Sequence, residues 1–241
     1  MPFSPKALEF LFENRLHDSK AWFDEHKDIY KKYVTEPFTE VAAELAPLFN
    51  EIDPKLVCTP RRIARVRRDT RFTKDKSLFR DNIWITISRE KERFEQPPCF
   101  YFGISQTGFS YGCGYYQADR DSMDALRELV LTGDKSFKAA QKAMKNQNTF
   151  ALCGEMYKRS KFPDEKEELR QWLDRKNIYV DYESADFEML FSDKLIEKLK
   201  EDFQLIVPVY RFFDSAEKLR KSAVNREAEK LVQRSRAGED F

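Results

Sequence analysis

Apolar residues recur at helical spacing through the first fifty residues of this 241-residue chain. The Ser-Pro pair at 4–5 has the residue types of a helix N-terminus, and the apolar positions after it return every three or four residues. A second helix is expected after Asp18 or Ser19, and a third after Pro37. The pattern therefore predicts an N-terminal helical hairpin or three-helix cap.

β-Branched and aromatic residues then concentrate in short segments that are typical of strands. These segments are residues 63–68, IWITISR at 83–89, CFYFGIS at 99–105 and FSYGCGYY at 109–116. The turn at 106–108 predicts that the last two segments pair as an antiparallel hairpin. Gly112 and Gly114 predict a bulge in the last strand or a close approach by another backbone.

Helical spacing returns in the second half of the chain, with two more β-rich stretches between the helices. The helices are expected at 121–132, at 134–146, at 164–176 and from Asp193 onward with an interruption at Pro208, and the strands at 149–155 and 178–184. Strands that are gathered between helical blocks and joined as hairpins favour an α+β fold on an antiparallel or mixed sheet, with an N-terminal helical hairpin and C-terminal helices. We expect a single domain at 1–215 and a helical, frayed tail at 216–241.

The composition excludes several classes of protein. With 43 Lys and Arg against 42 Asp and Glu, the net charge of +1 does not indicate a generally basic, nucleic-acid-coating surface. Hydrophobic residues make up 41% of the chain, which is enough for a real core. The N-terminus lacks the features of a secretory signal, no stretch is apolar enough to span a membrane, and the four cysteines form no Cys-x-x-Cys pair. We therefore expect a cytoplasmic protein with free thiols and no membrane partner.

Common catalytic and nucleotide-binding motifs are missing from the sequence. His17 and His26 do not have the i, i+4 spacing of a helical metal site, and no metal site is expected. No Walker-type phosphate loop occurs, and GCGYY at 112–116 lacks the third glycine of a dinucleotide fingerprint. The sequence thus identifies no cofactor, and it leaves the question of enzymatic activity open.

The segment RRIARVRRDTRFTKDKSLFR at 61–80 holds nine Lys or Arg and two Asp. If it begins as a strand, Arg65 and Arg67 lie on one face while Arg62 and Arg68 lie on the other. Arginines on both faces of a strand are costly to bury unless carboxylates or a bound anion compensate them. Because Arg and Lys together suit phosphate or carboxylate groups, the segment predicts a site for a phosphorylated or other anionic small molecule.

We expect this site in the basic loop at 61–82, next to the aromatic hairpin. The expected residues are, for anion binding, Arg65, Arg68, Arg71, Lys74, Lys76 and Ser77, and, for the pocket wall, Tyr101 and Tyr111. Asp69 and Asp75 are the catalytic candidates if the pocket is an active site. In one alternative, these acids neutralise the arginines and the loop is a structural salt-bridge network. In another, the chain is a non-enzymatic module for protein or nucleic acid, of which nucleic acid is the less favoured partner because the net charge is close to zero.

The run RRDTRFTKDKSLFR at 67–80, preceded by Arg65 and Val66, resembles the signature of a conserved uncharacterised family, domain of unknown function 2461. Members of that family carry the run Arg-Asp-x-Arg-Phe-Ser-Lys-Asp-Lys-Ser-Pro-Tyr-Lys. This chain departs from the run at 78–80, where it has Leu-Phe-Arg. The aromatic ring and the positive charge are kept, whereas the rigid turn set by proline is not.

Two weaker features agree with the resemblance, which covers about residues 1–215. They are WFDEHKDIY at 22–30, and GCGYY at 112–116 followed by Leu126 and Arg127. The positions that the resemblance marks are Arg65, Arg68, Asp69, Arg71, Phe72, Lys74, Asp75, Lys76 and Ser77, with Trp22, Phe23, Tyr30, Gly114 and Arg127 as lesser matches. The resemblance thereby adds Arg127 to the expected pocket wall. Because the family has no established activity, the resemblance implies a fold and candidate residues but no reaction.

Overall fold

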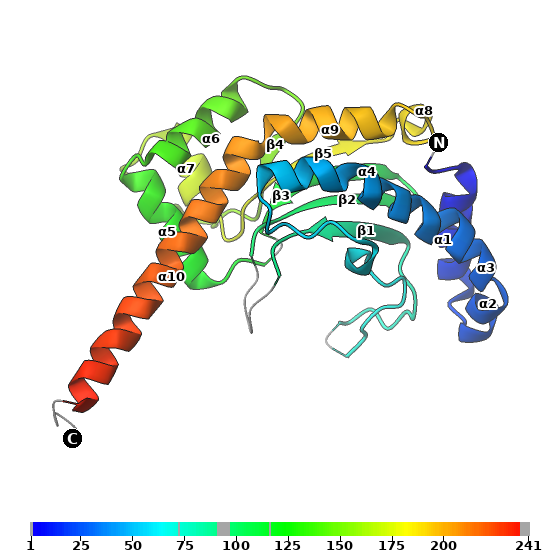
Figure 1. Ribbon diagram of the computed structural model, residues 1–241, viewed down its shortest axis with the longest axis horizontal. Coiled ribbons are helices and arrows are strands. Elements are labelled where there is room, and N and C mark those ends of the chain that lie inside the picture. Colours follow the sequence, from blue (N-terminus) through cyan, green and yellow to red (C-terminus); the bar gives the residue numbers. More distant parts are fainter. Residues whose placement is uncertain (1, 72, 91–96, 116, 237–241) are drawn as a thin grey trace.

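A computed structural model describes residues 2–71, 73–90, 97–115 and 117–236 of the chain, with their side chains as far as residue 224. The described chain combines a five-stranded sheet with N-terminal and C-terminal helices (Figure 1). All neighbouring strands of the sheet are antiparallel. The predicted α+β fold class is therefore confirmed.

Helical blocks flank the strands on both sides along the chain. The helices are α1 (Pro5–His17), α2 (Lys20–Glu25), α3 (Lys27–Tyr30), the π-helix η1 (Lys31–Thr35), α4 (Glu36–Ile52), the 3₁₀ helix η2 (Pro60–Arg62), α5 (Arg120–Leu131), α6 (Lys135–Lys145), α7 (Glu167–Leu173), α8 (Phe187–Leu190), α9 (Leu195–Leu205) and α10 (Val207–Arg236). The strands are β1 (Asn82–Ile87), β2 (Cys99–Ser105), β3 (Gly108–Gly114), β4 (Ala151–Cys153) and β5 (Tyr179–Ser184). Helix α7 is shorter than the helix expected at 164–176.

The strands lie in the order β1-β2-β3-β5-β4. β2 and β3 pair along their whole length, which confirms the predicted hairpin. β5 comes last in the sequence but lies between β3 and the short edge strand β4. Residues near position 180 are thus brought next to the hairpin at 99–114.

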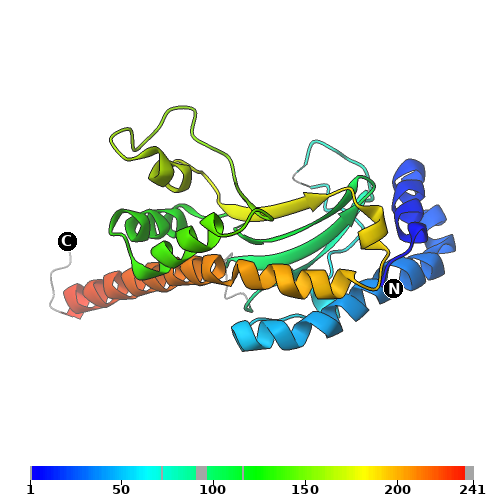
Figure 2. The ribbon, with the colours of Figure 1, turned by 90° about the horizontal axis from the view of Figure 1, so that it is seen from above.

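Side chains alternate across the sheet, and one of its faces forms the core. Ile83, Ile85 and Ile87 of β1 are buried on this face, together with Phe100 and Phe102 of β2. Helices α4, α9 and α10 run along it (Figure 2), and their apolar side chains complete the core. The alternate positions of the same strands are polar or small except for Trp84 and Tyr101, so the second face is available for functional groups.

β3 lies so close to β5 that only glycine fits at several of its positions. A Cβ on Gly112 would stand 1.9 Å from the carbonyl oxygen of Val180, and one on Gly114 would stand 2.4 Å from the Cα of Tyr179. Gly114 also has a φ of 150°, which residues with a side chain rarely adopt. The predicted close approach of a backbone to this strand is confirmed, and the approaching backbone is that of β5.

Residues 63–68 do not form a strand, so this prediction was wrong. With the edge of β1 and the chain before it they form isolated bridges at Ile63 and Arg67 and a few backbone hydrogen bonds, but no continuous ladder. Among their side chains only Val66 is buried, so no continuous apolar face holds the segment against the sheet. It is instead an extended edge piece that leads into the loop at 69–77.

The C-terminal helices are separated at Ile206, which confirms the predicted interruption near Pro208. Pro208 lies in the first turn of α10, where a backbone N–H has no helical partner in any case. α10 continues through residue 216 to Arg236 and extends away from the sheet (Figure 1). None of the described helices combines the length and the apolar composition required of a membrane span.

Candidate functional site

The loop at 69–77 is tied to the N-terminal helices through Asp18. This residue ends α1, and its carboxylate accepts hydrogen bonds from the backbone N–H groups of Leu78 (2.7 Å) and Phe79 (3.0 Å). Asp18 has a φ of 44°, in the left-handed region that residues other than glycine seldom occupy. A single carboxylate therefore holds the chain where it returns from the loop to β1.

Asp69 and Arg71 form an exposed ion pair at the start of the loop. Their charged atoms lie 2.7 Å apart, and hydrogen bonding to this guanidinium lowers the pKa of Asp69 to about 2. Lys76 reaches back across the loop and donates a hydrogen bond to the backbone carbonyl of Thr70 at 2.8 Å. These contacts close the loop on itself.

Asp75 is the centre of a second set of contacts. Its carboxylate accepts a hydrogen bond from the backbone N–H of Ser77 at 3.0 Å. It also forms ion pairs with Arg68 at 3.0 Å and with Arg15 of α1 at 3.2 Å. The Ser77 hydroxyl first, and then the two guanidinium groups, lower the pKa of Asp75 to about 2. Asp75 is thus ionised at neutral pH and connects the loop to α1.

Replacing Asp18 with alanine is expected to lower the free energy of unfolding by about 1 to 2 kcal/mol, because two backbone N–H groups lose their acceptor. The same change should speed amide hydrogen exchange at Leu78 and Phe79. Urea denaturation and exchange followed by NMR measure the two effects. Asp81→Ala removes an exposed acid from the same region and is the control. Equal effects of the two substitutions would contradict the anchoring role of Asp18.

The predicted anion-binding residues fall into two groups. Those that make the contacts described above are Arg68, Arg71, Lys76 and Ser77. Arg65 and Lys74 are exposed and form no ion pair or hydrogen bond with any residue that the structure describes. Phe72, which the family resemblance also marks, lies outside the described residues. Anion binding by these residues, and catalysis by Asp69 or Asp75, stay predictions.

The three residues predicted for the pocket wall lie apart from one another. Tyr101 is on the open face of β2, where its hydroxyl donates a hydrogen bond to Asp181 of β5. Tyr111 is on the core face of β3, where its hydroxyl is bonded to the buried Asp202 of α9. Arg127 is buried on α5 and donates to backbone carbonyls at the end of α7. Of these three residues, Tyr101 lines the hollow described next.

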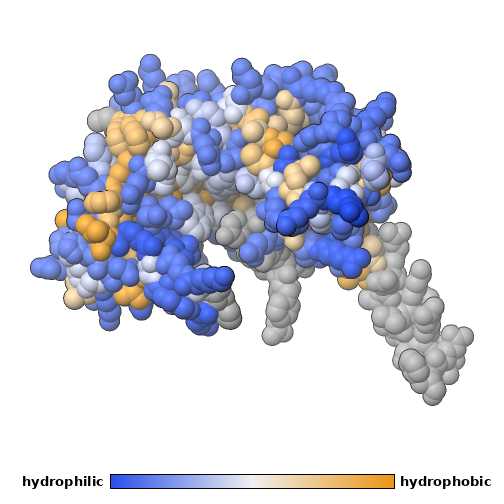
Figure 3. Space-filling model, turned by 180° about the vertical axis from the view of Figure 1, so that it is seen from behind, coloured by the Kyte–Doolittle hydropathy of each residue, from blue (hydrophilic) through white to orange (hydrophobic). Residues whose placement is uncertain are grey.

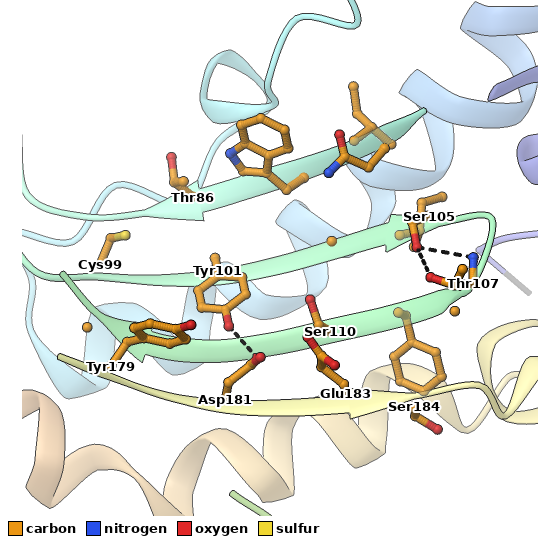
Figure 4. A pocket seen from close by; sticks show the side chains of 18 of the residues that line it. Thr86, Cys99, Tyr101, Ser105, Thr107, Ser110, Tyr179, Asp181, Glu183 and Ser184 are labelled. Atoms are coloured by element: carbon orange, nitrogen blue, oxygen red, sulfur yellow. Dashed lines mark hydrogen bonds between the residues drawn. The ribbon is translucent and has the colours of Figure 1, made fainter. Parts of the chain in front are cut away.

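The open face of the sheet forms a hollow of about 930 Å³, a size typical of small-molecule sites. Its main side chains are those of Arg80, Trp84, Tyr101, Tyr179, Asp181 and Glu183. Figure 4 shows how residues from β1, β2, β3 and β5 gather over it. The surface is hollowed below the sheet, beside the hydrophilic projection that contains the basic loop (Figure 3). Among the described residues, no three His, Cys, Asp or Glu side chains gather as they would around a metal ion.

Arg80 forms part of the wall of the hollow next to β1. Its guanidinium lies 4.9 Å from the centre of the Trp84 ring, in a cation–π contact. Its Nε atom is buried and has no hydrogen-bond partner among the described residues. The guanidinium forms no ion pair with the described residues, so an anion in the hollow can supply its counter-charge.

Asp181 and Glu183 project into the hollow from β5 (Figure 4). Burial raises the pKa of Asp181, the hydrogen bond from Tyr101 opposes this rise, and the charge of Glu183 adds to it. In the part of the chain that the structure describes, no basic side chain pairs with either carboxylate. The β5 side of the hollow therefore carries negative charge without a counter-ion from the described residues.

Of the main side chains of the hollow, the sequence-based prediction did not include Arg80, Trp84, Tyr179, Asp181 and Glu183. A signal for all of these except Arg80 is present in the sequence. In IWITI at 83–87, Trp and Thr alternate with isoleucine, and in YVDYES at 179–184, Asp and Glu alternate with Val and Tyr. A strand with one apolar and one polar face turns the polar face away from the core. Reading both strands by face would have placed these side chains on one surface of the sheet.

Comparison with known sequences identifies a family. The model of a family described as a conserved hypothetical protein, DUF2461, matches residues 6–212 of the chain. No curated protein matches it. The matched range contains both the basic loop and the residues that line the hollow.

Proposed function

The chain belongs to the DUF2461 family of conserved hypothetical proteins, and we propose that it binds a small organic anion, such as a phosphorylated metabolite, in the hollow of its sheet. The observation that carries the proposal is Arg80, a cation in the wall of that hollow whose guanidinium forms no ion pair or hydrogen bond with the described residues. Contact with the Trp84 ring restricts the orientation of the guanidinium, and its planar donors suit phosphate or carboxylate oxygens.

The segment beside Arg80 supports the proposal with further positive charge. The backbone N–H of Arg80 donates to the carbonyl of Val66 at 2.9 Å, so residues 61–67, which comprise the end of η2 and most of the extended piece, lie beside it. The arginines among them that form no ion pair within the described residues are Arg61, Arg62, Arg65 and Arg67. Charges on the surface act over about 8 Å at physiological ionic strength. These side chains therefore raise the potential on the β1 side of the hollow and attract an anion to it.

A second hypothesis is that the basic segment binds nucleic acid or a protein and that its loop is purely structural. The ion pairs of Asp69 and Asp75 support a structural role for the loop itself. The unpaired carboxylates of Asp181 and Glu183 oppose a polyanion in the hollow. Salt dependence separates the two hypotheses, because binding to duplex DNA weakens with a log-log slope of roughly 0.9 per contacted phosphate, whereas a compact ligand responds much less.

Arg80→Met is expected to weaken the binding of a phosphorylated ligand about tenfold or more, because a charge-assisted hydrogen bond contributes about 1.5 to 3 kcal/mol. Methionine keeps an apolar contact with Trp84, so the fold should be retained. A thermal-shift panel of nucleotides and sugar phosphates finds the ligand, since saturation at a hundred times Kd adds about 2.7 kcal/mol of stability. Isothermal titration calorimetry then compares the variant with the unmodified protein.

Substitutions of two lysines test whether any loss of affinity is specific to the charge and the position of Arg80. Lys142→Met removes an exposed cation from α6 and should leave the affinity unchanged. Lys74→Met tests the tip of the basic loop. Unchanged affinity in folded Arg80→Met, with a loss in Lys74→Met, would move the site from the hollow to the loop. No response to any compound of the panel would contradict the proposal of a small anionic ligand.

A further inference from the structure

The hollow has charges of opposite sign on its two sides. Arg80 lies next to β1, whereas Asp181 and Glu183 lie on β5. The charges on neither side are neutralised by the described residues. Arg80 forms no ion pair with them, and no basic side chain among them pairs with the two carboxylates. The described residues thus supply no counter-charge to either side, which leaves both sides open to solvent or to a ligand.

The strand register aligns the two sides in a row across the sheet. Glu183 pairs with Ser110, Ser110 lies opposite Gly103, and Gly103 lies opposite Trp84. Three strand spacings, roughly 14 Å, separate β1 from β5 along this row. The two middle positions carry only a hydroxymethyl group and a hydrogen, so the floor between the charged sides is nearly bare backbone. An extended ligand can lie flat on it and reach both sides.

Asp181 occupies the neighbouring row, opposite Gly112 and next to Glu183 on the same face of β5. The Tyr101 hydroxyl donates to one of its oxygen atoms, which fixes the carboxylate against β2. The oxygen sites that remain on Asp181 and Glu183 can accept further hydrogen bonds. Two carboxylates so close together favour a cation between them, because their charges otherwise repel each other.

We propose that the ligand is dipolar, with its anionic group at Arg80 and a protonated amine between Asp181 and Glu183. This inference rests on the proposed function, because it assigns the second end of the same site. The ring of Trp84 lies beside the anionic end of the ligand, and the ring of Tyr179, two residues before Asp181 on β5, lies near its cationic end. A ligand with an anion at both ends is repelled on the β5 side, and one with an amine alone leaves Arg80 without its acceptor.

Aminohexyl phosphate is a direct probe of this inference, with hexyl phosphate as its amine-free counterpart. Isothermal titration calorimetry at moderate salt measures both affinities. The amino compound is expected to bind about tenfold more tightly than hexyl phosphate, a difference of about 1.4 kcal/mol. The phosphate group is common to both compounds, so the difference reports the amine alone.

The double substitution Asp181→Asn with Glu183→Gln removes both charges from β5 but keeps an oxygen acceptor for Tyr101. In this variant the advantage of aminohexyl phosphate should disappear, whereas hexyl phosphate should bind at least as tightly as before. Glu188→Gln, which removes an exposed acid from α8, is the control and should preserve the advantage. Circular dichroism establishes that each variant is folded.

The outcomes distinguish this inference from the proposed function. Equal affinities of the two compounds for the unmodified protein would overturn the dipolar ligand but leave anion binding intact. The same conclusion would follow if aminohexyl phosphate still bound more tightly than hexyl phosphate in the double variant. Failure of both compounds to bind, together with a silent thermal-shift panel, would overturn the proposed function itself. Binding of aminohexyl phosphate that is unchanged by Arg80→Met would also overturn the dipolar arrangement, because the anionic end would have no role.

Discussion

Gly112→Ala is expected to lower the free energy of unfolding by about 3 kcal/mol or more, a large effect for one methyl group. The new Cβ would stand 1.9 Å from the carbonyl oxygen of Val180, well inside van der Waals contact. The atom that it meets belongs to the backbone of β5, which cannot rotate out of the way as a side chain can. Either β5 moves away from β3 or the hydrogen bonds between the two strands are lost.

Urea denaturation of Gly112→Ala and of a second glycine variant measures this effect. Gly133→Ala is the matched control, because Gly133 has a φ of 60° but its added Cβ would meet nothing closer than the Lys138 side chain at 3.5 Å. Its cost should be about 1 to 2 kcal/mol, the usual penalty of a left-handed backbone. If Gly112→Ala is no less stable than Gly133→Ala, the close approach of β3 and β5 does not require glycine.

Arg127→Leu is expected to lower the free energy of unfolding by about 3 kcal/mol, because its removal leaves several buried acceptors without a donor. The side chain is 9% exposed. It donates to the carbonyl oxygens of Leu173 at 3.1 Å and Arg175 at 2.9 Å, and it pairs with Asp124 at 2.7 Å. The guanidinium therefore joins α5 to the end of α7, and leucine can replace none of these bonds.

Arg120→Leu is the control for this substitution, because Arg120 lies on the same helix and faces the same partner. Its guanidinium is 3.5 Å from Asp124 but its side chain is 90% exposed. We expect a change within about 0.5 kcal/mol, as for most exposed ion pairs. Similar midpoints for the two variants in thermal or urea unfolding would contradict the structural role of Arg127.

Most of the helices and strands were predictable because their signals are local. The β2–β3 hairpin needed only two alternating segments and a short turn, and the glycines of β3 indicated a nearby backbone. Residues 63–68 misled the prediction because β-branched residues are present without a buried face, and Val66 alone enters the core. Propensity identified an extended segment there, but packing decides whether a segment joins a sheet.

The candidate site was less predictable because its contacts connect distant parts of the chain. Positive charge at 61–80 was evident, but Asp18, which holds the end of the loop, lies about sixty residues upstream. Asp181 and Glu183 reach the hollow because β5 inserts beside β3, and no local pattern reveals that strand order. Arg80 belongs to the same basic run as the loop residues, and only its contact with Trp84 sets it apart.

Because β5 is synthesised long after β3, the edge of β3 that pairs with β5 stays unpaired for a time during synthesis of the chain. β1, β2 and β3 are complete at Gly114, whereas β5 begins at Tyr179, about 65 residues later. At ordinary rates of translation this interval lasts roughly 3 to 13 s. For those seconds the free edge of β3 offers its unpaired backbone groups to any extended chain nearby. Misassembly with a neighbouring nascent chain, or capture by a chaperone, competes with folding at this step.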